Sequence, residues 1–286
     1  MEIGKVVSDI RNKKNIKVNQ LIGTRMTRST YTRFIAGQID TSASNFIFML
    51  NRMHVTYDEF LYIKDGYMAS RFDGYLAELQ TAVLSSNLNQ IQKIETESEL
   101  IFKNENSIEY QHLYYTCKIF EGKLNHQELD EDAKDGLIKY LMDTEFWTHY
   151  ELVLFNNIMF IFDIEMMDLI IDRVLRNIKK YNSMNKYGNE SFRVLINCLI
   201  RYIDTNNFIK AKRTLHQIEK IKLRDDMLFE KCLLKFFQGI IMIVTGDSRG
   251  IKQAQESIQV WEILQIKSEK NIANMYLKNI IAKFVK

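Results

Sequence analysis

The sequence contains no proline and only 11 glycines among 286 residues. Sheets and their turns consume both residue types, so their scarcity favours a nearly all-helical chain. Its three cysteines lie far apart in apolar segments, which argues against a disulfide framework or a cysteine metal site. No apolar run is long enough to cross a bilayer, and the chain does not start with the apolar stretch of a signal peptide. We therefore expect a soluble, cytoplasmic protein that has no membrane partner.

The residue patterns of common catalytic sites are missing as well. The five histidines are scattered, and there is no HExxH, no GxSxG and no glycine-rich phosphate loop. The sequence therefore predicts no catalytic residues, no metal and no cofactor, in a protein that is not an enzyme.

Positive charge is concentrated in the first 65 residues. They hold ten lysines and arginines against six aspartates and glutamates, whereas the other 221 residues hold 29 against 30. A basic region on a nearly neutral body is typical of proteins that contact nucleic-acid phosphates.

The same 65 residues have the pattern of five short helices. Ile3 and Ile10 share the apolar face of a first helix, while Thr27 and Gly37 are the expected N-cap and terminating glycine of a third. A short second helix and a tight turn precede the third helix. This arrangement predicts a lambda-repressor-like helix-turn-helix bundle over 1–65, whose third helix enters the major groove of double-stranded DNA.

The polar side of the third helix supplies most of the candidate DNA contacts. Its hydroxyl and guanidinium groups suit base edges and phosphates, and two flanking polar residues extend the surface. The residues expected to contact DNA are Lys14, Gln20, Arg28, Ser29, Thr30 and Arg33. The alternative is a small interaction module whose polar face is only hydrated.

From residue 66 onward the chain repeats a helix pair with a period of roughly 40 residues. Each unit joins an aromatic-rich helix to a second amphipathic helix through a polar turn. The units fall at 72–94, 113–141, 155–178, 196–218 and 235–264, and a capping helix covers 271–286. Stacked pairs form a solenoid with a concave groove. We expect an all-α protein with a TPR-like helical-repeat domain over 66–286, whose groove suits an extended peptide or a partner helix.

Polar residues interrupt the apolar inner helices of this domain. Asn156 and Asn157 interrupt "LVLFNNIMFIF", and Asn197 interrupts "VLINCLI". An asparagine carries a donor and an acceptor, so it can pair with the backbone of a peptide in the groove. Lys231 can meet an acidic group there. The alternative for each asparagine is an ordinary hydrogen bond between helices.

Four segments together point to a known family. "MEIGKVVSDIRNKK", "RSTYTRFIAG", "LNRMHVTYDEF" and "WTHYELVLFNN" resemble the Rgg/GadR/MutR family of transcriptional regulators from Gram-positive bacteria. The resemblance implies a cytoplasmic homodimer that binds promoter DNA and senses a short signalling peptide of the quorum-sensing type. It implies DNA contacts at Arg11, Arg28, Ser29, Thr30, Tyr31 and Arg33. It implies peptide contacts at Asn157, Tyr187, Asn197, Phe229 and Lys231.

Two functions therefore have to be compared. The first is a DNA-binding transcriptional regulator whose repeat domain senses a peptide and controls promoter binding or activation. The second is a helical-repeat scaffold that binds a protein partner and does not bind DNA.

Overall fold

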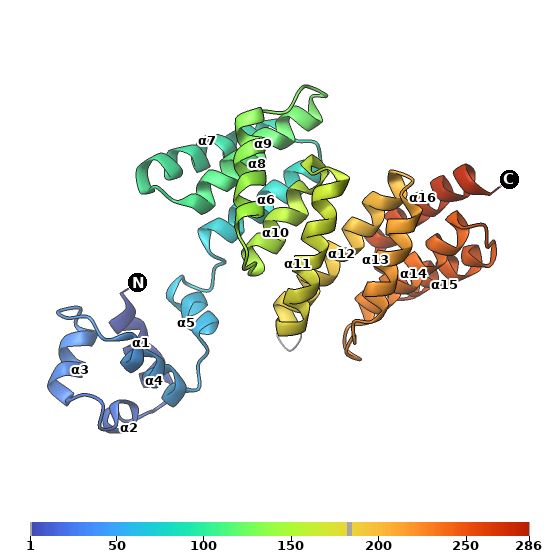
Figure 1. Ribbon diagram of the computed structural model, residues 1–286. Coiled ribbons are helices and arrows are strands. Elements are labelled where there is room, and N and C mark those ends of the chain that lie inside the picture. The colour runs from blue at the N-terminus through green and yellow to red at the C-terminus, as the bar shows by residue number, and fades with distance from the viewer. Residues whose placement is uncertain (1, 182–184, 286) are drawn as a thin grey trace. The chain divides into compact units, whose positions relative to one another are not determined.

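The computed structural model describes residues 2–181 and 185–285, with side chains described for all of these except 177–189. Within these ranges every regular element is helical and no strand occurs (Figure 1). The all-helical fold expected from the missing prolines is thus confirmed. The chain divides into two compact units, Met1–Tyr110 and Gln111–Lys286, and each is described by itself.

The first unit begins with a bundle of five short helices. These are α1 (Ile3–Lys13), α2 (Val18–Ile22), α3 (Arg28–Ile35), α4 (Ala43–Met53) and α5 (Tyr57–Lys64). Val6, Leu21 and Phe34 belong to their common buried core. Two longer helices, α6 (Arg71–Leu84) and α7 (Leu88–Glu105), follow and pack against each other. The boundary expected after residue 65 falls between α5 and α6, inside the first unit.

The predicted caps fix where the helices of the bundle begin and end. The Thr27 hydroxyl accepts the Thr30 backbone N–H at 3.1 Å, which starts α3. Gly37, with φ of +70°, ends the same helix in a conformation that few other residues adopt. Thr56 and Glu59 form the expected capping box at the start of α5. The limits of α3 therefore follow from local sequence signals.

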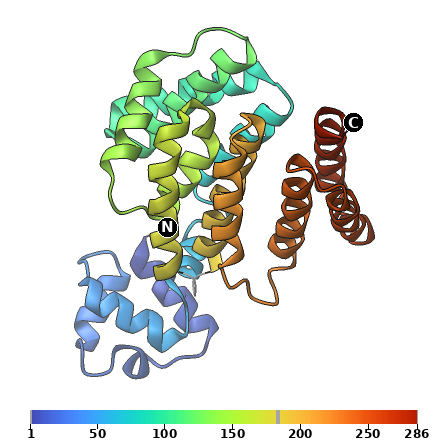
Figure 2. The same cartoon turned by 45° about the vertical axis from the view of Figure 1, so that its right-hand side comes forward.

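The second unit is a stack of helices (Figure 2). It comprises most of α8 (Ile108–Leu124), then α9 (Glu131–Asp143), α10 (His149–Ile158), the 3₁₀ turn η1 (Met159–Ile161), α11 (Ile164–Tyr181), α12 (Asn185–Asp204), α13 (Phe208–Glu219), α14 (Leu228–Val244), α15 (Arg249–Ile263) and α16 (Lys267–Phe284). From α11 to α16 each helix packs on its neighbour in sequence, and α10 also packs on α12. This nearest-neighbour packing is that of a helical-repeat solenoid.

The "WTHYEL" segment is built into the core of this stack. Trp147 is fully buried and its indole N–H donates to the Leu141 carbonyl at 3.2 Å. The Glu151 carboxylate accepts the Thr148 N–H at 2.6 Å and the Tyr140 hydroxyl at 2.7 Å. Burial alone would raise the pKa of Glu151, yet these hydrogen bonds hold that pKa below its ordinary value. The segment fixes α10 against α9.

Gly250 lets α14 and α15 cross with their backbones in contact. A Cβ added there would overlap the Gly239 carbonyl oxygen, and one added at Gly239 would lie 2.7 Å from the Gly250 oxygen. We expect Gly250→Ala to lower the free energy of unfolding by about 2 kcal/mol, because the clash exceeds the gain in helix propensity. Thermal melting followed by circular dichroism measures the effect.

Gly74 of α6 is the matched control, because nothing lies within 4 Å of a Cβ at this position. Gly74→Ala should be neutral or stabilise by about 0.5–1 kcal/mol. Equal melting temperatures for the two variants would show that α14 and α15 do not need the small residue.

Candidate functional site

The outer face of α3 is polar, exposed and cationic. Arg28, Ser29, Thr30 and Arg33 are all exposed. Neither Arg28 nor Arg33 has a hydrogen-bond acceptor or an acidic partner among the side chains that the structure describes. The Thr30 hydroxyl lies 2.9 Å from that of Thr27, and the two hydroxyls stand together at the start of the helix. The bundle thus presents to solvent two guanidinium groups that have no partner among the described side chains.

Tyr31 is part of the core and is not exposed, contrary to its place among the expected DNA contacts. Its side chain is 2% exposed, because it lies on the side of α3 that packs against α1. The Arg11 Nε donates to the Tyr31 hydroxyl at 3.2 Å, and the Arg11 Nη1 donates to the Ile16 carbonyl at 2.8 Å. Arg11 and Tyr31 therefore brace α3 from beneath.

Lys14 and Gln20 are exposed but already hold the bundle together. The Lys14 ammonium donates to the Met53 carbonyl at 2.8 Å, at the C-terminal end of α4. The Gln20 side chain accepts the Lys17 N–H at 3.0 Å in the capping box of α2. Whether either residue also contacts DNA stays a prediction.

Two arginines that the sequence analysis missed flank a single aromatic ring. The guanidinium carbons of Arg25 and Arg52 each lie 5.1 Å from the centroid of the Phe48 ring. Arg25 is in the turn before α3 and Arg52 is on α4. The ring holds both cations at the surface by cation–π attraction. The two arginines come together only because α4 packs beside that turn. No pattern within a short stretch of sequence therefore predicts the pair.

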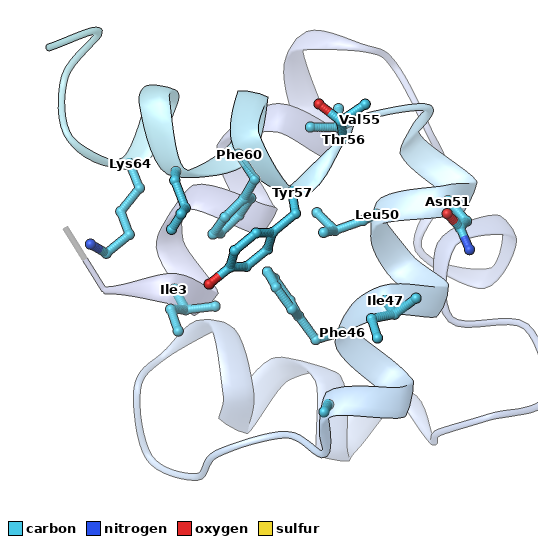
Figure 3. A pocket seen from close by; sticks show the side chains of 12 residues that line it. Ile3, Phe46, Ile47, Leu50, Asn51, Val55, Thr56, Tyr57, Phe60 and Lys64 are labelled. Atoms are coloured by element: carbon cyan, nitrogen blue, oxygen red, sulfur yellow. The ribbon is translucent and has the colours of Figure 1, made fainter. Parts of the chain in front are cut away.

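An apolar hollow of about 580 Å³ opens on α1, α4 and α5. Figure 3 shows Phe46, Tyr57 and Phe60 around it, with Phe46 edge-on to both other rings. Ile47 and Tyr57 are more than half exposed at its rim. No residue of α3 lines the hollow, so the cationic face described above lies apart from it.

In the second unit, two of the predicted peptide contacts lie together. The Asn197 side-chain amide of α12 donates to the Asn156 oxygen of α10 at 3.1 Å, and the Asn156 amide donates to Glu190 at 3.3 Å. The interhelical hydrogen bond considered as the alternative is therefore present. Asn157, beside Asn156, is half-buried and its side chain has no hydrogen-bond partner among the described residues.

The other predicted peptide contacts lie elsewhere. Phe229 of α14 packs toward Trp261 of α15, with ring centroids 6.3 Å apart. Lys231 forms an ion pair of 2.8 Å with exposed Asp225 and lines a shallow hollow between α14 and α15. The Tyr187 side chain lies outside the described residues. The structure thus gathers Asn156, Asn157 and Asn197 and leaves Phe229 and Lys231 on a different pair of helices.

A match to a protein family identifies the kind of protein that has these features. Residues 85–278 match the model of the C-terminal domain of the HTH-type transcriptional regulator Rgg. The chain belongs to the Rgg family. The resemblance found in the sequence is confirmed. The predicted function as a transcriptional regulator is confirmed as well, because this C-terminal domain follows a helix-turn-helix bundle.

Solved structures have the same architecture as this Rgg family chain. RopB is 30% identical over 79% of this chain and 100% of its own, with a TM-score of 0.60. A candidate transcriptional regulator from Listeria monocytogenes EGD-e is 19% identical, with coverage of 99% and 98% and a TM-score of 0.87. Rgg2 of Streptococcus dysgalactiae is 20% identical, with coverage of 97% and 99% and a TM-score of 0.78. The match extends over both units of the chain.

The structure also bears on membrane spans and metal sites. Across the part of this Rgg chain that the structure describes, no helix is long and apolar enough to span a membrane. Within the same part, no three histidine, cysteine, aspartate or glutamate side chains are grouped so that they can hold a metal ion.

Proposed function

We propose that the bundle over 1–65 binds promoter DNA through α3, and that the repeat domain over 66–286 binds a short signalling peptide and controls this binding. The observation that carries the proposal is the pair of exposed arginines on α3 that have no partner among the described residues, in a chain whose residues 85–278 match the Rgg C-terminal domain. Such a regulator meets its promoter in the cytoplasm. Its family does not point to an enzyme.

The DNA interface consists of Arg28, Ser29, Thr30 and Arg33, with Arg25 and Arg52 beside them. In a helix-turn-helix protein the first residues of the recognition helix contact base edges, and flanking cations contact phosphates. Arg28 and Ser29 occupy the first positions of α3, and Arg25 lies in the turn before it. Tyr31 contributes by bracing the helix and is left out of the interface.

The peptide groove is placed at Asn156, Asn157 and Asn197. A half-buried asparagine without a partner can donate to and accept from a peptide backbone, as Asn157 does in this proposal. Related proteins support a peptide as the ligand. Rgg2 of Streptococcus dysgalactiae is an SHP pheromone receptor, and PrgX has been crystallised with cCF10. A peptide that binds one conformation better than another changes DNA affinity by linkage.

An Asn157→Ala, Asn197→Ala double variant should lose the peptide response and keep its basal affinity for DNA. Removing the two amides takes away backbone hydrogen bonds that contribute about 1 kcal/mol each. Fluorescence anisotropy of labelled peptides encoded beside the gene measures binding directly. Exposed Asn104 of α7 provides the control variant Asn104→Ala. An unchanged response in the double variant would place the groove elsewhere.

A homodimer completes the proposal. Apolar side chains on α15 and α16, and just after α15, are exposed: Val260, Ile263, Leu264, Ile272 and Met275. Exposed apolar side chains on two helices that pack on each other suit an interaction site, and a second copy is the partner that a regulator of this family implies.

An Ile263→Asp, Met275→Asp variant should therefore be monomeric at concentrations where the unmodified chain is dimeric, because two carboxylates would have to be buried. Sedimentation equilibrium of the full chain gives the mass. Ile209 of α13 is 88% exposed and lies on another helix, so Ile209→Asp should leave the mass unchanged. A dimer in the double variant would remove this surface from the interface.

A further inference from the structure

Phe48 of α4 is a large aromatic side chain that lies outside the core of the bundle. It is half-buried, and among the described residues it is not one of the apolar side chains that pack against that core. The next two residues, Met49 and Leu50, are buried in the core instead. A Cβ added at Gly23 would lie 3.2 Å from the Phe48 Cζ. The ring therefore lies over the turn between α2 and α3.

Two arginines from different segments share this ring. Arg25 lies in the turn and Arg52 in the last turn of α4, and each guanidinium carbon is 5.1 Å from the ring centroid. Twice this distance is the largest separation that the two guanidinium carbons can have. Both side chains are exposed, and neither has a hydrogen-bond acceptor or an acidic partner in the part of the chain that the structure describes. The ring thus keeps two positive charges near each other at the surface.

An arginine held by an aromatic ring keeps its hydrogen-bonding capacity. The attraction between the cation and the ring uses no oxygen or nitrogen acceptor, so the five N–H donors remain for another partner. A side chain that is already fixed loses less conformational freedom when it binds, which strengthens the contact. Phosphate oxygens match the geometry of these donors.

The place of the pair beside α3 indicates the phosphates of a DNA strand. Arg25 precedes Arg28, the first residue of α3, by three positions. Residues that flank a recognition helix contact the sugar–phosphate backbone, whereas the helix itself contacts base edges. Successive phosphates of one strand follow each other at about 3.4 Å along the helix axis. Two arginines on one ring can therefore contact neighbouring phosphates of the same strand.

We propose that Phe48 is a positioning residue for DNA binding, whose ring holds Arg25 and Arg52 against neighbouring phosphates of one strand. The inference rests on the proposed DNA-binding function and specifies how the backbone beside α3 is bound. The two arginines contact the phosphates, and Phe48 acts only through them. Such contacts strengthen binding to any duplex, whereas contacts from α3 to base edges distinguish one sequence from another.

An Arg25→Ala, Arg52→Ala variant of the full chain tests the phosphate contacts. It should bind a duplex selected by the protein and a duplex of unrelated sequence more weakly by the same factor, at least about tenfold. The slope of log affinity against log salt concentration should become about 2 units shallower on both duplexes, because each lost contact releases fewer counterions. Anisotropy titrations between about 50 and 200 mM salt measure both quantities.

Exposed Lys252 of α15 and Lys278 of α16 provide the control. Lys252→Ala, Lys278→Ala removes the same charge and should leave the affinities and both slopes unchanged. If the arginine variant keeps the slope of the unmodified chain, the inference is overturned and the proposed function stands. If the unmodified chain binds neither duplex, the proposed DNA binding fails and the inference fails with it.

Neutral methylphosphonates, placed one at a time along the selected duplex, locate the contacts. The positions that weaken binding of the unmodified chain but not of the arginine variant should be neighbours on one strand. Positions on different strands, or no such positions, would overturn the inference.

Phe48→Leu separates positioning from a structural role. Leucine stays apolar but lacks the aromatic ring, so affinity for both duplexes should fall about fivefold. In the Arg25→Ala, Arg52→Ala background the same substitution should have no further effect, because the ring acts only through the two arginines. An equal loss in both backgrounds would show that Phe48 supports the fold and would overturn its positioning role.

Discussion

An Arg28→Ala, Arg33→Ala double variant should bind its promoter at least about 30-fold more weakly than the unmodified chain. A guanidinium that contacts a base edge contributes about 1–3 kcal/mol, and two such losses sum to about 2–6 kcal/mol. Both side chains are exposed and unpaired among the described residues, so their removal takes away no internal contact. Anisotropy titration of a labelled promoter duplex measures the loss.

The control separates loss of the interface from loss of one positive charge. Arg249 is exposed and pairs with Asp247 at 2.7 Å in the second unit, so Arg249→Ala should leave DNA affinity unchanged. Circular dichroism should show the same helix content for all the variants. If the double variant binds as tightly as the unmodified chain, α3 is not the recognition helix.

The second large effect is a loss of stability in mild acid, centred on His112. This side chain of α8 is 4% exposed, its Nδ1 lies 2.8 Å from the Tyr150 hydroxyl and its ring lies 4.3 Å from that of Tyr140. Burial lowers the pKa of His112 to about 4, although nearby Glu151 acts in the opposite direction. The neutral imidazole is the form that the folded chain holds.

The direction of the pH effect follows from that shift. Between pH 6.5 and 4 the unfolded chain binds a proton at His112 that the folded chain does not, so acid favours unfolding. The free energy of unfolding should be at its full value above pH 6.5 and fall by about 3 kcal/mol as the pH is lowered to 4. Both tryptophans, Trp147 and Trp261, lie in the second unit, so urea unfolding followed by their fluorescence reports on this unit alone.

Substituting the histidine tests the assignment. His112→Gln retains a partner for Tyr150 but does not titrate, so the free energy of unfolding should become nearly constant between pH 6.5 and 4.5. His216 is exposed on α13, and His216→Gln should keep the pH dependence of the unmodified chain. A steep dependence that persists in His112→Gln would assign the acid sensitivity to the carboxylates.

Local signals explain why so much of the bundle could be predicted from sequence. The caps at Thr27 and Thr56 and the terminating Gly37 act within a few residues, and each occurs in the structure as predicted. Tyr31 shows where the resemblance misled. Its spacing from Phe34 indicates a buried face, and the structure buries both residues, although the family pattern had placed Tyr31 among the DNA contacts.

Contacts between distant helices could not be predicted. Asn156 and Asn197 are 41 residues apart and meet only because α10 packs on α12. The polar side chains of the asparagines marked them as unusual in an apolar helix. Their hydrogen-bond partners could not be predicted, because these depend on how the helices of the stack pack.

We propose above that the basic bundle binds DNA largely through contacts that arginines make to phosphates and bases. The measurement that tests it most directly is the salt dependence of DNA affinity for the full chain, on a duplex selected by the protein from a random-sequence pool. Because each phosphate contact releases counterions, the affinity should fall steeply, by about 1000-fold or more between 50 and 200 mM salt. Failure to select any duplex, or an affinity that does not change with salt, would contradict the account.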